Sequence, residues 1–171
     1  MSKISKQPKS EIRPSLIISK VTENGEGSAV KFTLYPANGE TDGHVEVEIA
    51  DMVDGARFDW DNAGKARLYF GDVCNIIQVL RGKSYPLDGT RITASCSSDG
   101  ATEVIVNRRK EPTSGYWLEI VEEYGCIDCE HLCSCKDCER EKYSSIFLDD
   151  TYACGLCEAL AGAMHRIAFG D

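Results

Sequence analysis

Five cysteines lie within the thirteen residues from position 126 to position 138. Cys126 and Cys129 form one C-x-x-C pair, and Cys135 and Cys138 form a second. A tight C-x-x-C turn brings two thiolates to one metal ion, and two such pairs can supply the four sulfur ligands of a closed tetrahedral zinc site. The spacing therefore predicts a structural zinc ion in this segment.

The ligand set stays open, because further donors are near in sequence. Cys154 and Cys157 form a third C-x-x-C pair, and fifteen residues separate it from Cys138, a spacing common in zinc ribbons. The alternative ligand set is Cys135, Cys138, Cys154 and Cys157. With His131 and Cys133 included, the segment has enough donors for two metal ions. Cys154 and Cys157 are equally compatible with small packing residues of a helix.

A second group of candidate binding residues lies on expected strands. Residues 65–70 alternate, with Lys65, Arg67 and Tyr69 facing outward and Ala66, Leu68 and Phe70 facing inward. Bases stack on aromatic rings, and cations follow the phosphates of a single strand. The candidate contacts are Lys31, Tyr35, Phe58, Trp60, Lys65, Arg67 and Tyr69, with Arg108 and Arg109 beside Lys110 as a second basic cluster. The alternative interpretation is a solvated sheet face.

The charge distribution limits what kind of nucleic acid the chain can bind. The net charge is −9, but residues 1–110 carry fifteen basic and fifteen acidic side chains, so the excess acid lies in residues 111–171. An acidic protein binds duplex DNA weakly without a local basic patch. A nucleic-acid surface must therefore be a patch in the first part of the chain.

These residues need a scaffold, and the hydrophobic pattern predicts one. Alternating strands are expected at 15–21, 29–35, 44–49 and 65–70, followed by a helix that ends near Gly82. His44, Glu46 and Glu48 are expected to be exposed on their strand. The pattern repeats with strands at 90–96, 103–109, 116–121 and 144–148 and a last helix capped at 149–151. The fold class is α+β, with two repeats of four antiparallel strands and a helix.

The domain organisation follows from this pattern. Residues 1–13 are polar, with several lysines, and are expected to form a flexible basic tail. Residues 14–171 form one domain, interrupted by a cysteine-rich zinc hairpin at 124–143. No hydrophobic segment suits a signal peptide or a membrane span, so a cytoplasmic protein is expected.

In this arrangement the chain resembles the Whirly family of single-stranded-DNA-binding proteins and the related kinetoplastid guide-RNA-binding, positive-cofactor-like proteins. The matching strings are Phe58-Asp59-Trp60, the strand–helix joint from Leu68 to Gly82, Ser114 to Ile120, and Ser145 to Leu148 before an Ala-rich helix. The likeness covers about residues 14–123 and 144–169. Two features depart from it: the family's Lys-Gly-Lys-rich strand has only Lys31 and Lys65-Ala66-Arg67 as partial substitutes, and the cysteine hairpin is an insertion.

The resemblance implies a homo-oligomer that binds single-stranded DNA or RNA in replication, recombination or transcription regulation. The alternative function is a zinc-stabilised adaptor, whose acidic C-terminal half docks a basic protein partner at the hairpin. A weaker alternative is a redox or metal-handling protein. No Ser/His/Asp order, phosphate loop or supported carboxylate pair is present in the sequence, so a non-enzyme is expected.

Overall fold

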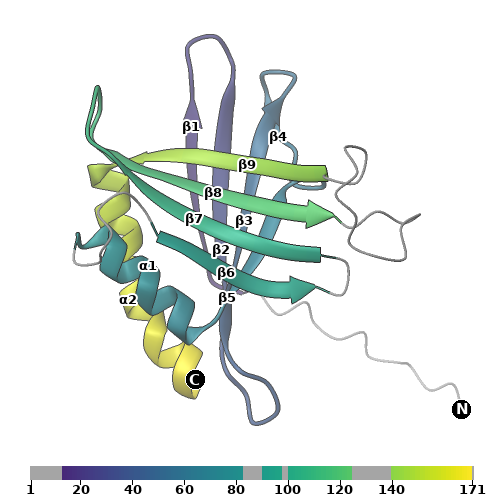
Figure 1. Ribbon diagram of the computed structural model, residues 1–171, viewed down its shortest axis with the longest axis vertical. Coiled ribbons are helices and arrows are strands. Elements are labelled where there is room, and N and C mark those ends of the chain that lie inside the picture. The colour runs from purple at the N-terminus through teal and green to yellow at the C-terminus, as the bar shows by residue number, and fades with distance from the viewer. Residues whose placement is uncertain (1–12, 83–89, 98–99, 125–139, 171) are drawn as a thin grey trace, which may run out of the picture.

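The computed structural model describes residues 13–82, 90–97, 100–124 and 140–170 (Figure 1). Over these residues the chain forms two antiparallel sheets and two helices. The elements of the first half are β1 (Ser15–Val21), β2 (Gly27–Tyr35), β3 (His44–Val53), β4 (Arg57–Phe58), β5 (Gly64–Leu68) and α1 (Phe70–Leu80). Those of the second half are β6 (Thr90–Ser97), β7 (Gly100–Arg109), β8 (Gly115–Tyr124), β9 (Arg140–Asp149) and α2 (Asp150–Phe169). The α+β class is confirmed, and each half runs through antiparallel strands into one helix; the first half has the short β4 in addition to the four expected strands.

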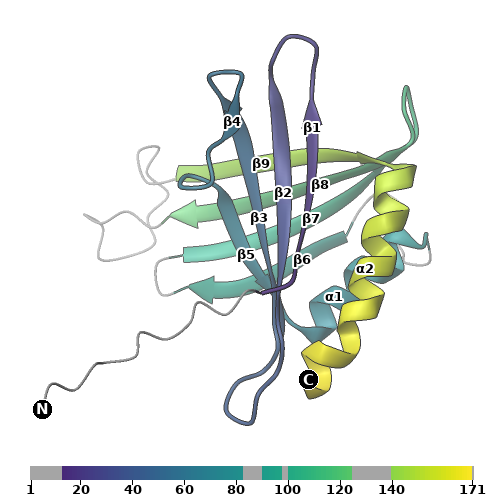
Figure 2. The same cartoon turned by 180° about the vertical axis from the view of Figure 1, so that it is seen from behind.

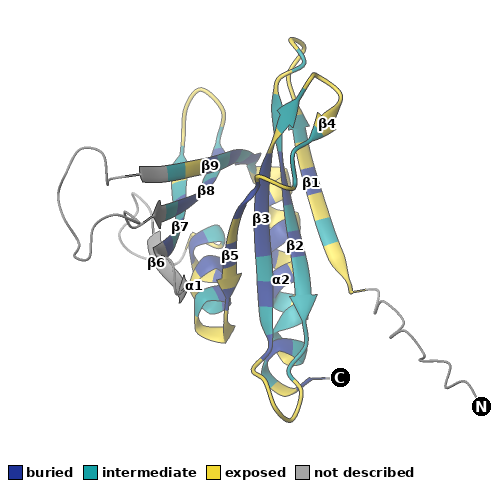
Figure 3. Ribbon diagram, turned by 90° about the vertical axis from the view of Figure 1, so that its right-hand side faces the viewer, coloured by how far each residue is buried: buried dark blue, intermediate teal, exposed yellow. Residues whose placement is uncertain are grey.

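The first sheet is organised around β3. This strand pairs with β2 on one side, and with β4 and β5 on the other, while β1 pairs with β2 at the edge. Much of β3 is buried (Figure 3), because Val45, Val47 and Ile49 alternate along it and face the core; each is at most 2% exposed. The second sheet has the simple order β6-β7-β8-β9.

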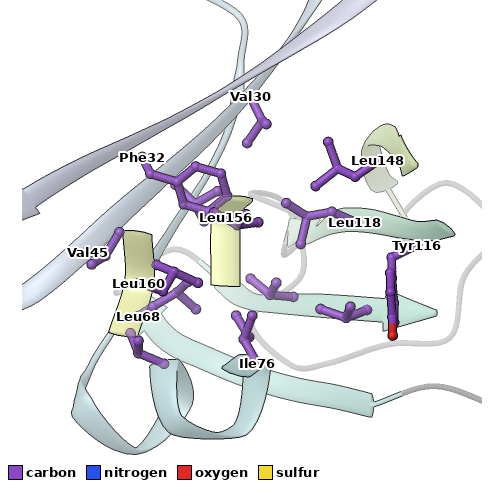
Figure 4. Packing of buried hydrophobic residues seen from close by; sticks show 14 of the residues in the cluster. Val30, Phe32, Val45, Leu68, Ile76, Tyr116, Leu118, Leu148, Leu156 and Leu160 are labelled. Carbon is purple, nitrogen blue, oxygen red and sulfur yellow. The ribbon is translucent and has the colours of Figure 1, made fainter. Parts of the chain in front are cut away.

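The two sheets cross, and the helices fill the space between them at one end (Figures 1 and 2). Apolar side chains from the inner faces of both sheets and from both helices form one continuous core. Figure 4 shows Phe32 and Val45 of the first sheet around Leu156 and Leu160 of α2, with Leu118 on the side of the second sheet. Over the described residues, the two halves of the chain therefore share one core.

At Gly64 the first sheet packs tightly against the second. A Cβ atom added there would lie 2.6 Å from Oγ of Ser144 on β9, and near Ile120 of β8. Only a residue without a side chain lets β5 begin this close to the second sheet. The start of β5 is thereby fixed, and with it the positions of Lys65 and Arg67.

The first strand–helix joint differs from expectation by one residue. Phe70 was expected to face inward as the last strand residue, but it begins α1 and is 48% exposed. The backbone N–H of Tyr69 donates to Oδ2 of Asp72 at 2.9 Å, which stabilises a helix start at this point. The expected helix before Gly82 is confirmed, and it buries Val73, Ile76 and Ile77 on one face.

The last two strands extend further than their apolar patterns indicated. β8 continues to Tyr124 and β9 starts at Arg140, and these two residues pair in the antiparallel register. The strands therefore occupy both ends of the expected 124–143 insertion, and residues 125–139 lie between them. The cysteines and His131 of this segment are outside the described residues, as is the expected tail up to residue 12.

Neither helix in the described part of the chain combines the length and the apolarity that a bilayer crossing needs.

Candidate nucleic-acid interface

The outer face of the first sheet collects side chains from three neighbouring strands. The antiparallel register sets Glu48 of β3 between Lys31 of β2 and Lys65 of β5. Two residues along β3, Glu46 lies between Thr33 and Arg67, and two further on His44 lies beside Tyr35. We call this surface the outer face; its residues are Lys31, Thr33, Tyr35, His44, Glu46, Glu48, Lys65 and Arg67.

Glu48 is the most buried charged residue of this face. It is only 5% exposed, and its carboxylate forms ion pairs with Lys31 and, at 3.2 Å, with Lys65. Two cations on adjacent strands compensate the cost of burying this carboxylate. Glu48 was expected to be exposed; the side chain does face outward, but the two lysines cover it. The ammonium of Lys65 remains accessible, since that side chain is 50% exposed.

Trp60 reaches the outer face because the chain doubles back after β3. Asp54 and Gly55 both have positive φ, of 56° and 63°, in the turn that leads to β4. Phe58 then pairs with Met52 of β3, and the rings of Phe58 and Trp60 lie 6.2 Å apart. The Lys31 ammonium lies 4.7 Å from the centre of the Trp60 ring, a cation–π contact.

The residues that follow Trp60 form a compact turn. Nδ2 of Asn62 donates to Oδ2 of Asp59 at 2.8 Å, and the backbone N–H of Asn62 donates to Oδ1. These hydrogen bonds favour the charged carboxylate and lower the pKa of Asp59. The turn connects the ring of Trp60 to the start of β5, so the aromatic and the cationic side chains share one surface.

The middle row of the outer face pairs Arg67 with Glu46. Nε of Arg67 lies 3.9 Å from Oε2 of Glu46, and the Arg67 side chain is 58% exposed. The hydroxyl of Tyr35 donates to Oε1 of Glu46 at 3.5 Å. Glu46 thus orients one cation and one aromatic ring of the outer face.

Three rings form an aromatic row at the other end of the outer face. The rings of Tyr35 and His44 stack at 4.5 Å with an interplanar angle of 10°, and Tyr69 lies 5.7 Å from His44. The Arg13 guanidinium lies 4.0 Å above the Tyr35 ring. Tyr69 is 40% exposed and is open to a ligand.

His44 was expected to be exposed, but it is half-buried in this row. Burial lowers its pKa, and the nearby charges of Arg67 and Arg13 lower it further, against the opposing effects of Glu46 and of the Asp42 backbone. The sequence contained one usable signal: His44 follows the outward alternation of β3. Its stacking partners became visible only from the strand register.

The second basic cluster does not join this surface. Arg108 donates to the hydroxyl of Tyr116 at 2.6 Å and to Ser114, and it lies 3.4 Å from Asp150 at the start of α2. Tyr116 is 2% exposed, so Arg108 is tied to the inner side of the second sheet. Arg109 lies 5.5 Å from the ring of Phe147, on β9 of the same sheet. The structure therefore separates Arg108 and Arg109 from Lys31 and Arg67.

Cys154 and Cys157 lie on α2, at the opposite end of β9 from residues 125–139. β9 spans ten residues, which at about 3.3 Å per residue is roughly 30 Å. Cys154 is exposed, whereas Cys157 is 3% exposed and its thiol lies 3.9 Å from the Ile77 carbonyl on α1. Cys157 thus packs between the helices.

Comparison with solved structures identifies the architecture. WHY1 from Arabidopsis thaliana superposes with a TM-score of 0.67 over 94% of this chain and 88% of that one, at 11% sequence identity. The chain has the Whirly fold. WHY3 from the same plant gives 0.64 at 9% identity, over 96% and 92% of the two chains. The plant transcriptional regulator PBF-2 gives 0.63 at 12% identity, over 93% and 84%.

The Whirly fold is therefore shared over nearly the whole chain, while the sequences are only 9–12% identical. No family model and no curated protein sequence matches the chain. Identities near 10% show the shared fold alone, and the part of the resemblance that concerned guide-RNA-binding proteins stays a prediction. What the outer face of this Whirly fold can bind must be argued from its own residues.

Proposed function

We propose that the protein binds single-stranded nucleic acid on the outer face of its first sheet and acts as a regulator of transcription or of DNA metabolism. The observation that carries this proposal is the presence of aromatic rings at both ends of a face on which Lys65 and Arg67 remain accessible. Trp60 lies near one end and Tyr69 near the other, with Lys65 and Arg67 between them.

Each part of this surface matches a need of an unpaired strand. Exposed rings accept bases whatever their sequence, and base–aromatic stacking contributes about 1–3 kcal/mol per base. Cations at Lys65 and Arg67, half or more exposed, can contact the phosphates between stacked bases. The Whirly fold supports the same proposal, since one of its members is described as a plant transcriptional regulator.

Fluorescence anisotropy with labelled oligo(dT) tests the proposal, with duplex DNA and RNA of the same length as competitors. We expect Lys65→Ala/Arg67→Ala to weaken binding on the order of tenfold. The slope of log affinity against log salt should become shallower by about 1.4, because each lost phosphate contact removes about 0.7. Trp60→Ala should weaken binding with little change in that slope, because it removes stacking and no charge.

Arg109→Ala/Lys110→Ala is the matched control. It removes the same charge from the second sheet and should leave oligo(dT) affinity close to that of the wild type. If this control weakened binding as much as Lys65→Ala/Arg67→Ala, the interface could not be confined to the outer face of the first sheet. If the wild type bound no oligonucleotide, a protein-docking adaptor would become the better proposal.

We also propose a structural zinc ion between β8 and β9, held by Cys126, Cys129, Cys135 and Cys138. The pairing of Tyr124 with Arg140 brings both ends of the cysteine segment onto adjacent strands, which favours a site closed within the segment. A joint site with Cys154 and Cys157 is disfavoured by the length of β9 and by the packing of Cys157. His131 and Cys133 remain candidates for a ligand of the same site.

Elemental analysis of the reduced protein tests the zinc proposal. We expect bound zinc in the wild type, its loss in Cys135→Ser/Cys138→Ser, and its retention in Cys154→Ser, which changes an exposed thiol of α2. Chelation should leave the far-ultraviolet circular dichroism of the sheets and helices nearly unchanged. Zinc-free wild-type protein, purified under reducing conditions, would contradict the proposal.

We infer that the protein forms a homo-oligomer through its helices. Large apolar side chains remain exposed there: Phe70 at the start of α1 is 48% exposed, and Tyr152 and Phe169 of α2 are 43% and 78% exposed. Burying such side chains against a second copy would be favourable. Light scattering on Phe169→Ser should show a smaller species than the wild type, and an unchanged mass would place the contact elsewhere.

A further inference from the structure

Carboxylates of β3 lie between the cations of the outer face. Glu48 forms ion pairs with both Lys31 and Lys65, and Glu46 lies 3.9 Å from Arg67. Among the described residues of the three strands that build this face, every cation therefore has a carboxylate neighbour. Acidic residues in the centre of this face are not expected of a surface that binds phosphate groups alone.

These carboxylates reduce the attraction of the face for phosphate. A phosphate that approaches Lys65 or Arg67 must share or displace a neighbour that already neutralises the cation. Glu48 is difficult to displace, because it is 5% exposed and held from two sides. Phosphate contacts supply nearly all of the affinity for duplex DNA when no base is read. The carboxylates thus penalise duplex binding most.

An unpaired strand has a second source of affinity on the same face. Trp60 lies at the Glu48 row and the Tyr35–His44–Tyr69 rings lie at the His44 row, four residues along β3, or about 13 Å away. Bases of a single strand can stack at both places, whereas bases within a duplex are already stacked on one another. Stacking is not weakened by the carboxylates.

We propose that Glu46 and Glu48 are specificity-determining residues, which make this interface select single strands over duplexes by lowering its affinity for phosphate. The inference rests on the proposed function and adds to it the discrimination between two forms of nucleic acid. The wild-type protein should bind single strands with a shallow salt dependence and bind duplexes poorly even at low salt.

The test is Glu46→Gln/Glu48→Gln, with anisotropy titrations on labelled oligo(dT) and on a duplex of the same length at several salt concentrations. We expect duplex affinity to rise on the order of tenfold and oligo(dT) affinity to rise less, so that the preference for single strands falls several-fold. The salt slope for duplex should steepen by up to about 1.8, since the double variant frees two accessible cations, Lys65 and Arg67, and each contributes about 0.9.

Glu119→Gln/Glu158→Gln is the matched control, because it changes the net charge equally on β8 and α2, away from the outer face. It should leave the preference unchanged. Glu46→Gln alone, at a side chain that is 23% exposed, keeps the test usable if the double variant does not fold, and should show a smaller shift in the same direction.

The outcomes separate this inference from the proposed function. A wild type that binds no oligo(dT) at low salt removes the proposed function and the inference with it. A wild type that binds oligo(dT), with a folded glutamine variant of unchanged preference or reduced affinity, overturns the role of Glu46 and Glu48 and leaves the interface in place.

Discussion

Nζ of Lys20 lies 2.6 Å from Oδ2 of Asp149, and this contact joins the edge strand of the first sheet to the start of α2. Oδ1 of Asp149 accepts the backbone N–H groups of Thr151 and Tyr152, so the same carboxylate caps the helix. The Lys20 ammonium also lies 3.8 Å from the Tyr152 ring. These hydrogen bonds, that from Lys20 foremost, lower the pKa of Asp149.

Replacement of Asp149 should separate the two roles of its carboxylate. Asp149→Ala loses the helix cap and the ion pair and should reduce the free energy of unfolding by about 1–2 kcal/mol. Asp149→Ser keeps a capping oxygen and should cost roughly half as much. Urea denaturation measures both, with Lys20→Ala as the variant that removes the ion pair and the contact with the Tyr152 ring but keeps the helix cap. Equal losses for the serine and alanine variants would show that capping contributes nothing.

Alanine substitution of Gly64 tests how closely the sheets approach, and the same substitution at Gly71 serves as the comparison. Gly64→Ala should destabilise the protein by about 1–3 kcal/mol, because the new methyl group meets Ser144 across the gap between β5 and β9. Gly71 lies in α1 with no atom within 4 Å of an added Cβ, so Gly71→Ala should stabilise by about 0.5–1 kcal/mol. Thermal unfolding measures the change in stability of each variant. Changes of the same sign in both variants would refute the prediction.

Tyr116→Phe should affect stability and leave binding intact. The Tyr116 hydroxyl accepts from Arg108 and lies 3.3 Å from the carbonyl oxygens of Val79 and Leu80 at the end of α1. Its removal leaves a guanidinium short of a partner and should cost about 1–2 kcal/mol in urea denaturation. Oligo(dT) affinity should stay at the wild-type value, and a loss of affinity in the folded variant would return Arg108 to the interface.

The titration of His44 should contribute to the pH dependence of the free energy of unfolding. Burial lowers the pKa of His44 below its ordinary value of 6.5, so the unfolded chain binds more protons than the folded one just below that pH. The stabilisation is therefore fully present above pH 6.5 and is lost as the pH falls through the folded-state pKa. His44→Phe keeps a ring beside Tyr35 and should make the free energy of unfolding less dependent on pH below 6.5. An identical curve for the variant would rule out His44 as its source.

The strands were predictable because their period of two is a local property. Val30 and Phe32 in the expected strand 29–35, and Val45 and Val47 in the expected strand 44–49, occupy alternate positions, and all four are at most 5% exposed. The hairpin of β3 and β4 was missed, since Ala50 to Val53 breaks the alternation before the turn at Asp54 and Gly55. The start of α1 at Phe70 depends on the Asp72 cap, which competes with a strand pattern that includes Phe70.

The candidate site was predictable in its residues but not in its interactions. Outward positions of Lys31, Lys65 and Arg67 follow from alternation, whereas their pairing with Glu46 and Glu48 depends on how β2, β3 and β5 align. Arg108 illustrates the opposite case. Its place in a basic run indicated a surface cluster, while the buried hydroxyl of Tyr116, which only the fold brings near, makes it a structural residue.

The rung that pairs Tyr124 with Arg140 has a consequence for how such a protein can change over generations. Because the chain leaves β8 and enters β9 at two residues that pair with each other, residues 125–139 could be lengthened, exchanged or deleted without shifting the crossing of the sheets. The connection between β8 and β9 is thus a position that tolerates insertions and deletions. An evolving protein could gain or lose a small metal-binding segment there while the two sheets and the helices stay unchanged.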